Sequence, residues 1–162
     1  VAQKAVMEGK CPLEAKPELK DVMAAVHTQF PNAGEGNMGF GSTIFAVKPG
    51  DGSAREQAAS CQKVLGGWAN IANEYATKRY RSNLINWGML PLLIKEGELP
   101  FKNLDYVFFP GIRKAVEEKD SVIKAYAVKE GALVEFEMTL GELTDEERQI
   151  ILDGCLINYN RV

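Results

Sequence analysis

The chain has 162 residues, which is enough for one domain with a sizeable core. Its composition, 46% hydrophobic and 25% charged, is typical of a soluble globular protein. A formal net charge of −3 and a pI near 5.3 give no electrostatic reason to expect nucleic acid or an anionic membrane as a partner. The longest apolar runs, such as residues 89–94, are too short to span a membrane, and the N-terminal stretch lacks the apolar segment of a signal peptide.

The cysteines and the single histidine argue against several common catalytic centres. Cys11, Cys61 and Cys155 are widely spaced and form no C-x-x-C pair. We therefore expect neither a disulfide framework nor a self-contained zinc or iron–sulfur site, but reduced thiols in a cytoplasmic protein. His27 lies in a stretch with helical apolar spacing, where a position at the surface or at a helix end is expected.

Residues 1–41 are predicted to form a helix and a glycine-rich loop. Pro17 suits the first position of a helix that runs to about residue 30. The following PNAGEGNMGFG contains G-x-G-x-x-G, the pattern of a dinucleotide-binding turn. That turn must follow a strand and open a helix, whereas here a helix precedes it and the β-prone STIFAV follows. We therefore reject a dinucleotide site and expect an ordered loop or a flap.

The next part of the chain is predicted to alternate between strand and helix. Strands are expected at residues 42–47, 68–75 and 89–94, and helices at residues 54–65 and 77–88. The pair Gly66-Gly67 is expected to end the first helix, and Gly88 the second. This order predicts parallel βαβ crossovers, in which ligands bind at the carboxyl ends of the strands.

The remainder is predicted to add antiparallel strands and two helices. DYVFF is expected to form a strand, and SVIKAYAV and ALVEFEMTL a hairpin around the turn at residues 129–131. GIRKAVEEK is expected to form a short helix between them. TDEE, at residues 144–147, is a capping-box pattern that opens a helix towards Leu152, with Gly154 at its end.

The turn after the first predicted strand, PGDGSAREQAA, has two interpretations. Ser53 and Glu56 have the spacing of a capping box. The same serine, with Gly50, Gly52 and Arg55, would also surround an anion at a helix N-terminus. Because no base lies close to Ser53 in the sequence, the residues alone favour capping without catalysis.

Arginines near this turn are candidates for carboxylate binding. In a first helical turn, the charge of Arg55 opposes the helix dipole, and its fork suits a carboxylate or a phosphate. A salt bridge to Glu56, to Asp51 or to a distant acid would explain it equally well. Arg79 and Arg81, at the start of the second helix, either complete an anion pocket or belong to a solvated helix face.

The stretch GDGSAREQAA, followed by LGGWANIANEYATKRYRSNLINWGMLPL, resembles the C-terminal swivel domain of the aconitase family. That family typically shows G-x-G-S-S-R-E-H-A-A, then a helix that ends R-x-N-L, then G-x-L-P-L, and the closing ILDGCLINY is similar to its final helix. The matching residues are Gly50, Gly52, Ser53, Arg55, Glu56, Ala58, Ala59, Arg81, Asn83, Leu84, Gly88, Leu90, Pro91 and Leu92.

The resemblance implies an α/β fold: a three-layer β/β/α swivelling domain with a mainly parallel βαβ sheet and additional antiparallel strands. Residues 1–162 would form a single domain, with the N-terminal helix and loop in residues 1–41 and the core in residues 42–162. The implied function is that of an iron–sulfur hydro-lyase domain. It closes over the active site during the reversible dehydration of a hydroxy di- or tricarboxylic acid.

The resemblance also implies roles for individual residues. Ser53 would be the catalytic base that removes a proton beside a substrate carboxylate, and Arg55 would bind a substrate carboxylate. Gly52, Ala54 and Arg81 would complete the substrate-binding set. A [4Fe–4S] cluster would be held by other domains, since this chain lacks the cysteines for it. The expected partners are therefore cluster-bearing domains, in the same polypeptide or in a large subunit, and a small carboxylic acid, and the chain alone is expected to be inactive.

Three differences from the family pattern concern the substrate more than the reaction type. Ala54 replaces the second serine, Gln57 replaces the histidine, and no T-D-x-I-type segment precedes the turn. A hydratase that acts on something other than citrate is one hypothesis. A non-catalytic binding or regulatory domain is the main alternative, and a domain that serves only subunit assembly is a third.

Overall fold

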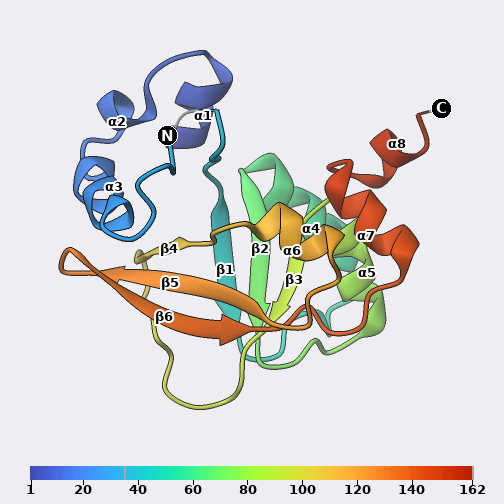
Figure 1. Cartoon of the computed structure of the whole chain (residues 1–162). Coiled ribbons are helices and arrows are strands. Elements are labelled where there is room, and N and C mark those ends of the chain that lie inside the picture. The colour runs from blue at the N-terminus through green and yellow to red at the C-terminus, as the bar shows by residue number, and fades with distance from the viewer. Residues whose placement is uncertain (35, 162) are drawn as a thin grey trace. The chain divides into compact units, whose positions relative to one another are not determined.

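The computed structural model describes residues 1–34 and 36–161 and has an α/β fold (Figure 1). It contains a parallel and an antiparallel three-stranded sheet, which confirms the predicted fold class. The chain folds into two compact units. Unit 1 comprises Val1–Phe40, Glu98–Pro110 and Lys124–Phe136, and unit 2 comprises Gly41–Gly97, Gly111–Ile123 and Glu137–Val162. Every helix in the described ranges is too short or too polar to cross a membrane.

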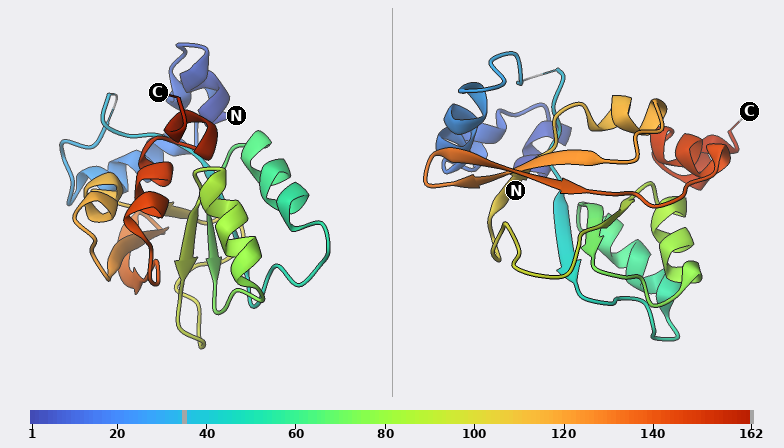
Figure 2. Two further views of the ribbon diagram at one scale, coloured as in Figure 1. Left: turned by 90° about the vertical axis from the view of Figure 1, so that its right-hand side faces the viewer. Right: turned by 60° about the horizontal axis from the view of Figure 1, so that its bottom comes forward.

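Unit 2 contains the parallel sheet, with β1 (Ser42–Ala46), β2 (Gly67–Ala72) and β3 (Leu90–Leu93) in that order. Two helices, α4 (Arg55–Val64) and α5 (Lys78–Asn86), connect the strands and contact each other (Figure 2). The predicted βαβ crossovers are therefore confirmed. Because the strand order follows the chain order, right-handed crossovers place both helices on one face of the sheet.

The core of unit 2 includes Leu84, Ile85, Met89 and Leu92, all fully buried. A polar ladder crosses it: the hydroxyl of Tyr80 accepts hydrogen bonds from the side chains of Asn70 (2.8 Å) and Gln62 (2.9 Å). The Tyr75 hydroxyl donates to the carbonyl oxygens of Asn70 (3.1 Å) and Leu92 (3.0 Å), and burial raises its pKa. These bonds satisfy the amide nitrogens of Asn70 and Gln62 and the two tyrosine hydroxyls, whereas the side-chain oxygens of Asn70 and Gln62 are buried with no partner among the described residues.

Three short helices complete unit 2: α6 (Ile112–Glu117), α7 (Asp145–Leu152) and α8 (Leu156–Tyr159). The predicted capping box at α7 is confirmed, because the Thr144 hydroxyl accepts from Glu147 N (3.1 Å) while the Glu147 carboxylate accepts from Thr144 N (2.9 Å).

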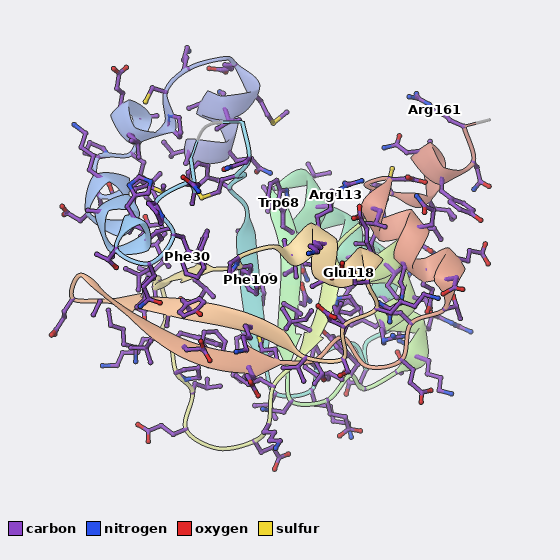
Figure 3. The ribbon with its side chains drawn as sticks, in the orientation of Figure 1. Phe30, Trp68, Phe109, Arg113, Glu118 and Arg161 are labelled. Carbon is purple, nitrogen blue, oxygen red and sulfur yellow. The ribbon has the colours of Figure 1, made fainter. Side chains whose placement is uncertain are left out.

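Helices α6 and α7 also exchange hydrogen bonds at their ends. Arg113 of α6 (Figure 3) donates to Leu152 O of α7 (3.1 Å), and Arg148 of α7 donates to Val116 O of α6 (3.3 Å). Each arginine thereby satisfies a carbonyl in the last turn of the other helix, where a cation is also favoured by the helix dipole.

Unit 1 contains α1 (Ala2–Met7), α2 (Pro12–Ala15) and α3 (Leu19–His27). The prediction that a helix starts at Pro17 is wrong. Leu19 N and Lys20 N donate to carbonyls only three residues back (3.0 Å each), so Pro17 lies in a turn that precedes α3. His27 is exposed at the end of α3, as predicted, with its Nε2 2.6 Å from Ala33 O. The predicted loop that follows includes Glu35, which lies outside the described residues.

The antiparallel sheet has the order β4 (Tyr106–Phe108), β5 (Ile123–Lys129) and β6 (Ala132–Met138). The predicted hairpin is confirmed, and its turn residues Glu130 (φ +49°) and Gly131 (φ +78°) have the positive φ angles of a two-residue hairpin loop. Phe30 (Figure 3) packs against the rings of Phe108 and Tyr126, with ring centres 5.2 Å apart in each pair.

Candidate functional site

The candidate site is the turn between β1 and α4, residues 47–54, with Arg55 at the start of α4, at the carboxyl end of the parallel sheet. The loop that follows β2 runs beside this turn, since Glu74 N donates to Val47 O (3.1 Å) and Ala76 N donates to Pro49 O (2.9 Å). Lys48 and Glu74 also form an ion pair between the two loops (2.9 Å). The turn is therefore held against its neighbour at the edge of the sheet where such folds bind ligands.

The capping box predicted for Ser53 and Glu56 is wrong. The N-cap residue of α4 is Ala54, and no side chain caps this helix. The Glu56 carboxylate instead accepts hydrogen bonds from Trp87 Nε1 (2.6 Å) and from the side-chain amide of Asn83. Because Glu56 reaches across to the end of α5, it does not reach back to its own helix start.

Arg55 binds the backbone of the turn rather than an acid. Its Nε donates to Gly50 O (2.9 Å) and its Nη2 donates to Asp51 O (3.4 Å). In the part of the chain that the structure describes, Arg55 forms no ion pair, so the predicted alternative of a salt bridge is not observed. One edge of the guanidinium is thus occupied by carbonyl oxygens, while Nη1 and the second hydrogen of Nη2 remain available.

Gly50 is a backbone position that only glycine can fill. Its φ is +100°, and an added Cβ would lie 2.5 Å from both Cβ and Cγ of Tyr80. Its carbonyl oxygen accepts a second hydrogen bond, from the hydroxyl of Thr77 (3.1 Å). Thr77 is also the N-cap of α5, because its hydroxyl accepts from Tyr80 N (3.2 Å).

Thr77 is a residue of the site that sequence reasoning missed. The signal for its capping role was present, since Thr77 opens the segment predicted as a helix and threonine is a preferred N-cap residue. Its bond to Gly50, 27 residues earlier, has no local sequence pattern.

Gly52, Ser53 and Ala54 are all exposed on the turn. No heavy atom lies within 4 Å of a Cβ added to Gly52, and its φ lies outside the left-handed range. Neither the backbone conformation nor a neighbouring side chain therefore explains the glycine at this position. The Ser53 hydroxyl has no hydrogen-bond partner among the described residues, so it is available to a ligand.

The structure gives Arg81 partners at the start of α7. Its guanidinium donates to Glu142 O and lies 3.7 Å from the Glu147 carboxylate. Part of its charge is therefore neutralised, in contrast to that of Arg55. Arg79 is exposed, as expected for a solvated helix face.

Within residues 1–34 and 36–161, no three histidine, cysteine or acidic side chains gather in an arrangement that could hold a metal ion. Cys11, Cys61 and Cys155 are free thiols. These residues do not fit a [4Fe–4S] cluster, which requires several thiolate ligands from one site.

Comparison with known proteins gives two similarities. The family model for the aconitase C-terminal domain matches residues 34–97, which include the whole parallel sheet, α4 and α5. Aconitate hydratase A of Rickettsia bellii (strain RML369-C) is 28% identical over 126 residues, which cover 75% of this chain and 14% of that protein. The chain thus corresponds to a small part of the length of this relative. The matched region contains the Gly50–Glu56 turn and the Arg81–Leu84 segment, so this part of the chain is similar to the C-terminal domain of the aconitase family.

Proposed function

We propose that this chain is the swivel domain of an aconitase-like hydro-lyase, which closes over the active site and contributes Ser53 as a base and Arg55 as a carboxylate ligand. The reaction is the reversible dehydration of a hydroxy di- or tricarboxylic acid. The observation that carries the proposal is the state of Arg55: its guanidinium is fixed by two backbone carbonyls, forms no ion pair in the described chain, and adjoins the exposed Ser53.

The electrostatics of the turn favour a bound carboxylate. Arg55 stands in the first turn of α4, where its charge adds to the positive end of the helix dipole. Because α4 has no side-chain cap, its first amide groups also face an approaching anion without competition. The same field lowers the energy of a serine alkoxide, which is the form in which Ser53 accepts a proton.

The proposed reaction divides the roles among these residues. In dehydration, the Ser53 alkoxide removes the proton from the carbon next to a carboxylate, and the electron pair of that C–H bond forms the double bond as the C–O bond on the neighbouring carbon breaks. The hydroxyl group leaves as water with a proton from a general acid that the proposed partner domains would supply. In hydration, Ser53 returns that proton. Arg55 holds the carboxylate in position, and Gly52 leaves room beside it, since its missing side chain faces open space. Arg81 and the backbone at Ala54 complete the proposed substrate-binding set.

The remaining parts of the enzyme lie in the proposed partners. A [4Fe–4S] cluster on the cluster-bearing domains would supply Lewis-acid chemistry for the leaving hydroxyl group. No step is assigned to it on this chain, whose described residues form no ligand set for it. The free thiols of the three cysteines support a reducing compartment such as the cytoplasm.

One observation favours a second candidate, a carboxylate-binding domain without catalysis. The Ser53 hydroxyl has no basic partner in the described chain, and Ala54 lacks the hydroxyl of the family motif. Such a domain would bind carboxylates through Arg55 and would not need Ser53.

Two variants separate these functions in the assembled enzyme, meaning this chain together with the cluster-bearing domains. With aconitate as the probe, Ser53→Ala is expected to lower kcat by roughly 10²–10⁴, the usual contribution of a positioned acid–base group, with little change in KM. Arg55→Lys is expected to raise KM roughly tenfold or more, because the bidentate fork is lost. Absence of aconitate turnover in the unaltered assembly, together with aconitate binding that Arg55→Lys weakens and Ser53→Ala leaves unchanged, would favour the second candidate.

A further inference from the structure

We propose that Thr77 is a positioning residue for Arg55: its hydroxyl holds the Gly50 carbonyl, which in turn orients the guanidinium towards the substrate carboxylate. The inference rests on the proposed function of Arg55. It adds a residue from the start of α5, outside the motif turn, to the set that determines carboxylate binding.

The geometry forms a continuous chain of hydrogen bonds. Tyr80 N donates to the Thr77 hydroxyl (3.2 Å), the hydroxyl donates to Gly50 O (3.1 Å), and Arg55 Nε donates to the same oxygen (2.9 Å). A carbonyl oxygen has two lone pairs, so it accepts both donors at once. Through this oxygen, the first turns of α5 and α4 are linked directly.

Without Thr77, the Gly50 carbonyl is the least restrained group in this series of hydrogen bonds. Glycine has the widest choice of backbone conformations, so the peptide that follows it reorients easily. The nearest backbone bond between the two loops, Ala76 N to Pro49 O, fixes the preceding carbonyl and not that of Gly50. In the described chain, only Arg55 and Thr77 donate to Gly50 O, and the Thr77 hydroxyl is the donor that is itself held by a backbone amide, that of Tyr80.

The orientation of the Gly50 carbonyl decides which edge of Arg55 meets the substrate. Nε and one hydrogen of Nη2 face Gly50 O and Asp51 O, so the side edge of the guanidinium is occupied by the protein. The carboxylate is therefore bound by the end of the guanidinium, through Nη1 and Nη2. If the Gly50 carbonyl turns away, the guanidinium loses this orientation although its charge stays.

The test uses Thr77→Val, which keeps the shape but removes the hydroxyl, and Thr77→Ser, which keeps the hydroxyl. In the assembled enzyme with aconitate, Thr77→Val is expected to raise KM roughly threefold to tenfold, as for the loss of one hydrogen bond, with kcat changed less than about threefold. Thr77→Ser is expected to restore KM. Thr28→Val, which removes a hydroxyl that donates to a backbone carbonyl (Ala25 O, 2.6 Å) in unit 1, is the matched control and is expected to leave KM unchanged.

A double-mutant cycle shows whether Thr77 acts through Arg55. In an Arg55→Lys background, Thr77→Val is expected to change KM by less than about twofold, because lysine has no Nε–H to orient. Equal effects in both backgrounds, or no effect of Thr77→Val in either, would overturn the inference while leaving the proposed role of Arg55 intact. An unchanged KM for Arg55→Lys itself would overturn the proposed role and this inference with it.

A second measurement covers the case in which Thr77→Val disturbs folding of α5. Thr77→Asp keeps an acceptor for Tyr80 N, and hence the cap, but has no proton to donate to Gly50 O. In NMR spectra of the chain, the Arg55 Nε–H is expected to exchange with water faster in Thr77→Asp than in the unaltered protein. Unchanged exchange would show that Thr77 only caps α5, and would refute the positioning role.

Discussion

Alanine substitution of Gly50 and of Gly52 separates a glycine that the fold requires from one that a ligand requires. The two residues lie two positions apart in the same turn, and both lie in the region that is similar to the aconitase C-terminal domain. Their surroundings differ. Gly50 has φ +100° and contacts Tyr80, whereas Gly52 has an ordinary φ and open space around it.

The structure sets the expected magnitudes. At Gly50, a non-glycine residue with positive φ costs about 1–3 kcal/mol, and forcing a methyl group against the Tyr80 ring costs a similar amount by overpacking. Gly50→Ala is therefore expected to lower the free energy of unfolding by about 2–6 kcal/mol. At Gly52, neither term applies, and a less flexible unfolded chain makes alanine neutral or stabilising by up to about 1 kcal/mol.

Urea unfolding followed by tryptophan fluorescence measures this difference, because both tryptophans, Trp68 and Trp87, lie in unit 2 with the turn. With slopes of about 1–3 kcal/mol per molar urea, Gly50→Ala is expected to move the midpoint by roughly 1 M or more. Gly52→Ala is expected to leave the midpoint in place and to lower kcat/KM of the assembled enzyme at least about tenfold, since its methyl group occupies the space proposed for substrate.

Either of two results would refute this reasoning. A Gly52→Ala chain destabilised by more than about 2 kcal/mol would mean that the open space around Gly52 is filled in the folded protein. A Gly52→Ala enzyme with unchanged kcat/KM would mean that no substrate approaches this backbone.

Three further predictions concern contacts around the site. Thr144→Val is expected to lower the free energy of unfolding by about 0.5–2 kcal/mol in urea, through loss of the α7 cap; an unchanged midpoint would contradict the capping box. Glu56→Ala is expected to cost about 1–3 kcal/mol and to shift the fluorescence of Trp87, whose indole N–H loses its acceptor; Glu56→Gln, which retains an acceptor, is the control. Lys119 lies 2.6 Å from the Asp145 carboxylate and lowers its pKa, first by the hydrogen bond and then by its charge. The stability that this pair contributes is therefore present above the unfolded-state pKa of Asp145 and is lost as the pH falls through its lowered pKa. In an NMR titration, Lys119→Met is expected to return the pKa of Asp145 to near 3.8. An unchanged pKa in this variant would rule out the pairing.

The elements of unit 2 could be predicted because their signals are local. Apolar runs such as MLPLLI are bounded by glycines, and the alternation with helical segments leaves parallel crossovers as the simple solution. Helices α1 and α2 were not predicted, since they have only six and four residues and show no sustained periodicity. The start of α3 was misplaced because proline is as compatible with a turn as with a first helical position.

The candidate site shows where local patterns fail. The spacing of a capping box occurs at Ser53-Glu56 and at Thr144-Glu147, and the box forms only at the second. At the first, the indole N–H of Trp87, 31 residues later, donates to the Glu56 carboxylate in place of the backbone amide at the helix start. A four-residue sequence pattern cannot predict this distant donor. The acceptors of Arg55 are backbone carbonyls. Because every residue has a backbone carbonyl, no sequence pattern predicts which ones Arg55 binds.

Two reciprocal arginine–carbonyl hydrogen bonds link α6 and α7, so we expect these two helices to fold and unfold as one cooperative element. With six and eight residues, each is shorter than the length at which an isolated helix is stable in water. Arg113 and Arg148 bind carbonyls of the opposite helix, so fraying of either helix removes a partner from the other. Segments about 30 residues apart in the chain are therefore expected to gain and lose structure together. Because α7 carries Glu147, opening of this element would also remove one of the two partners of Arg81, the other being Glu142 O, which lies before α7.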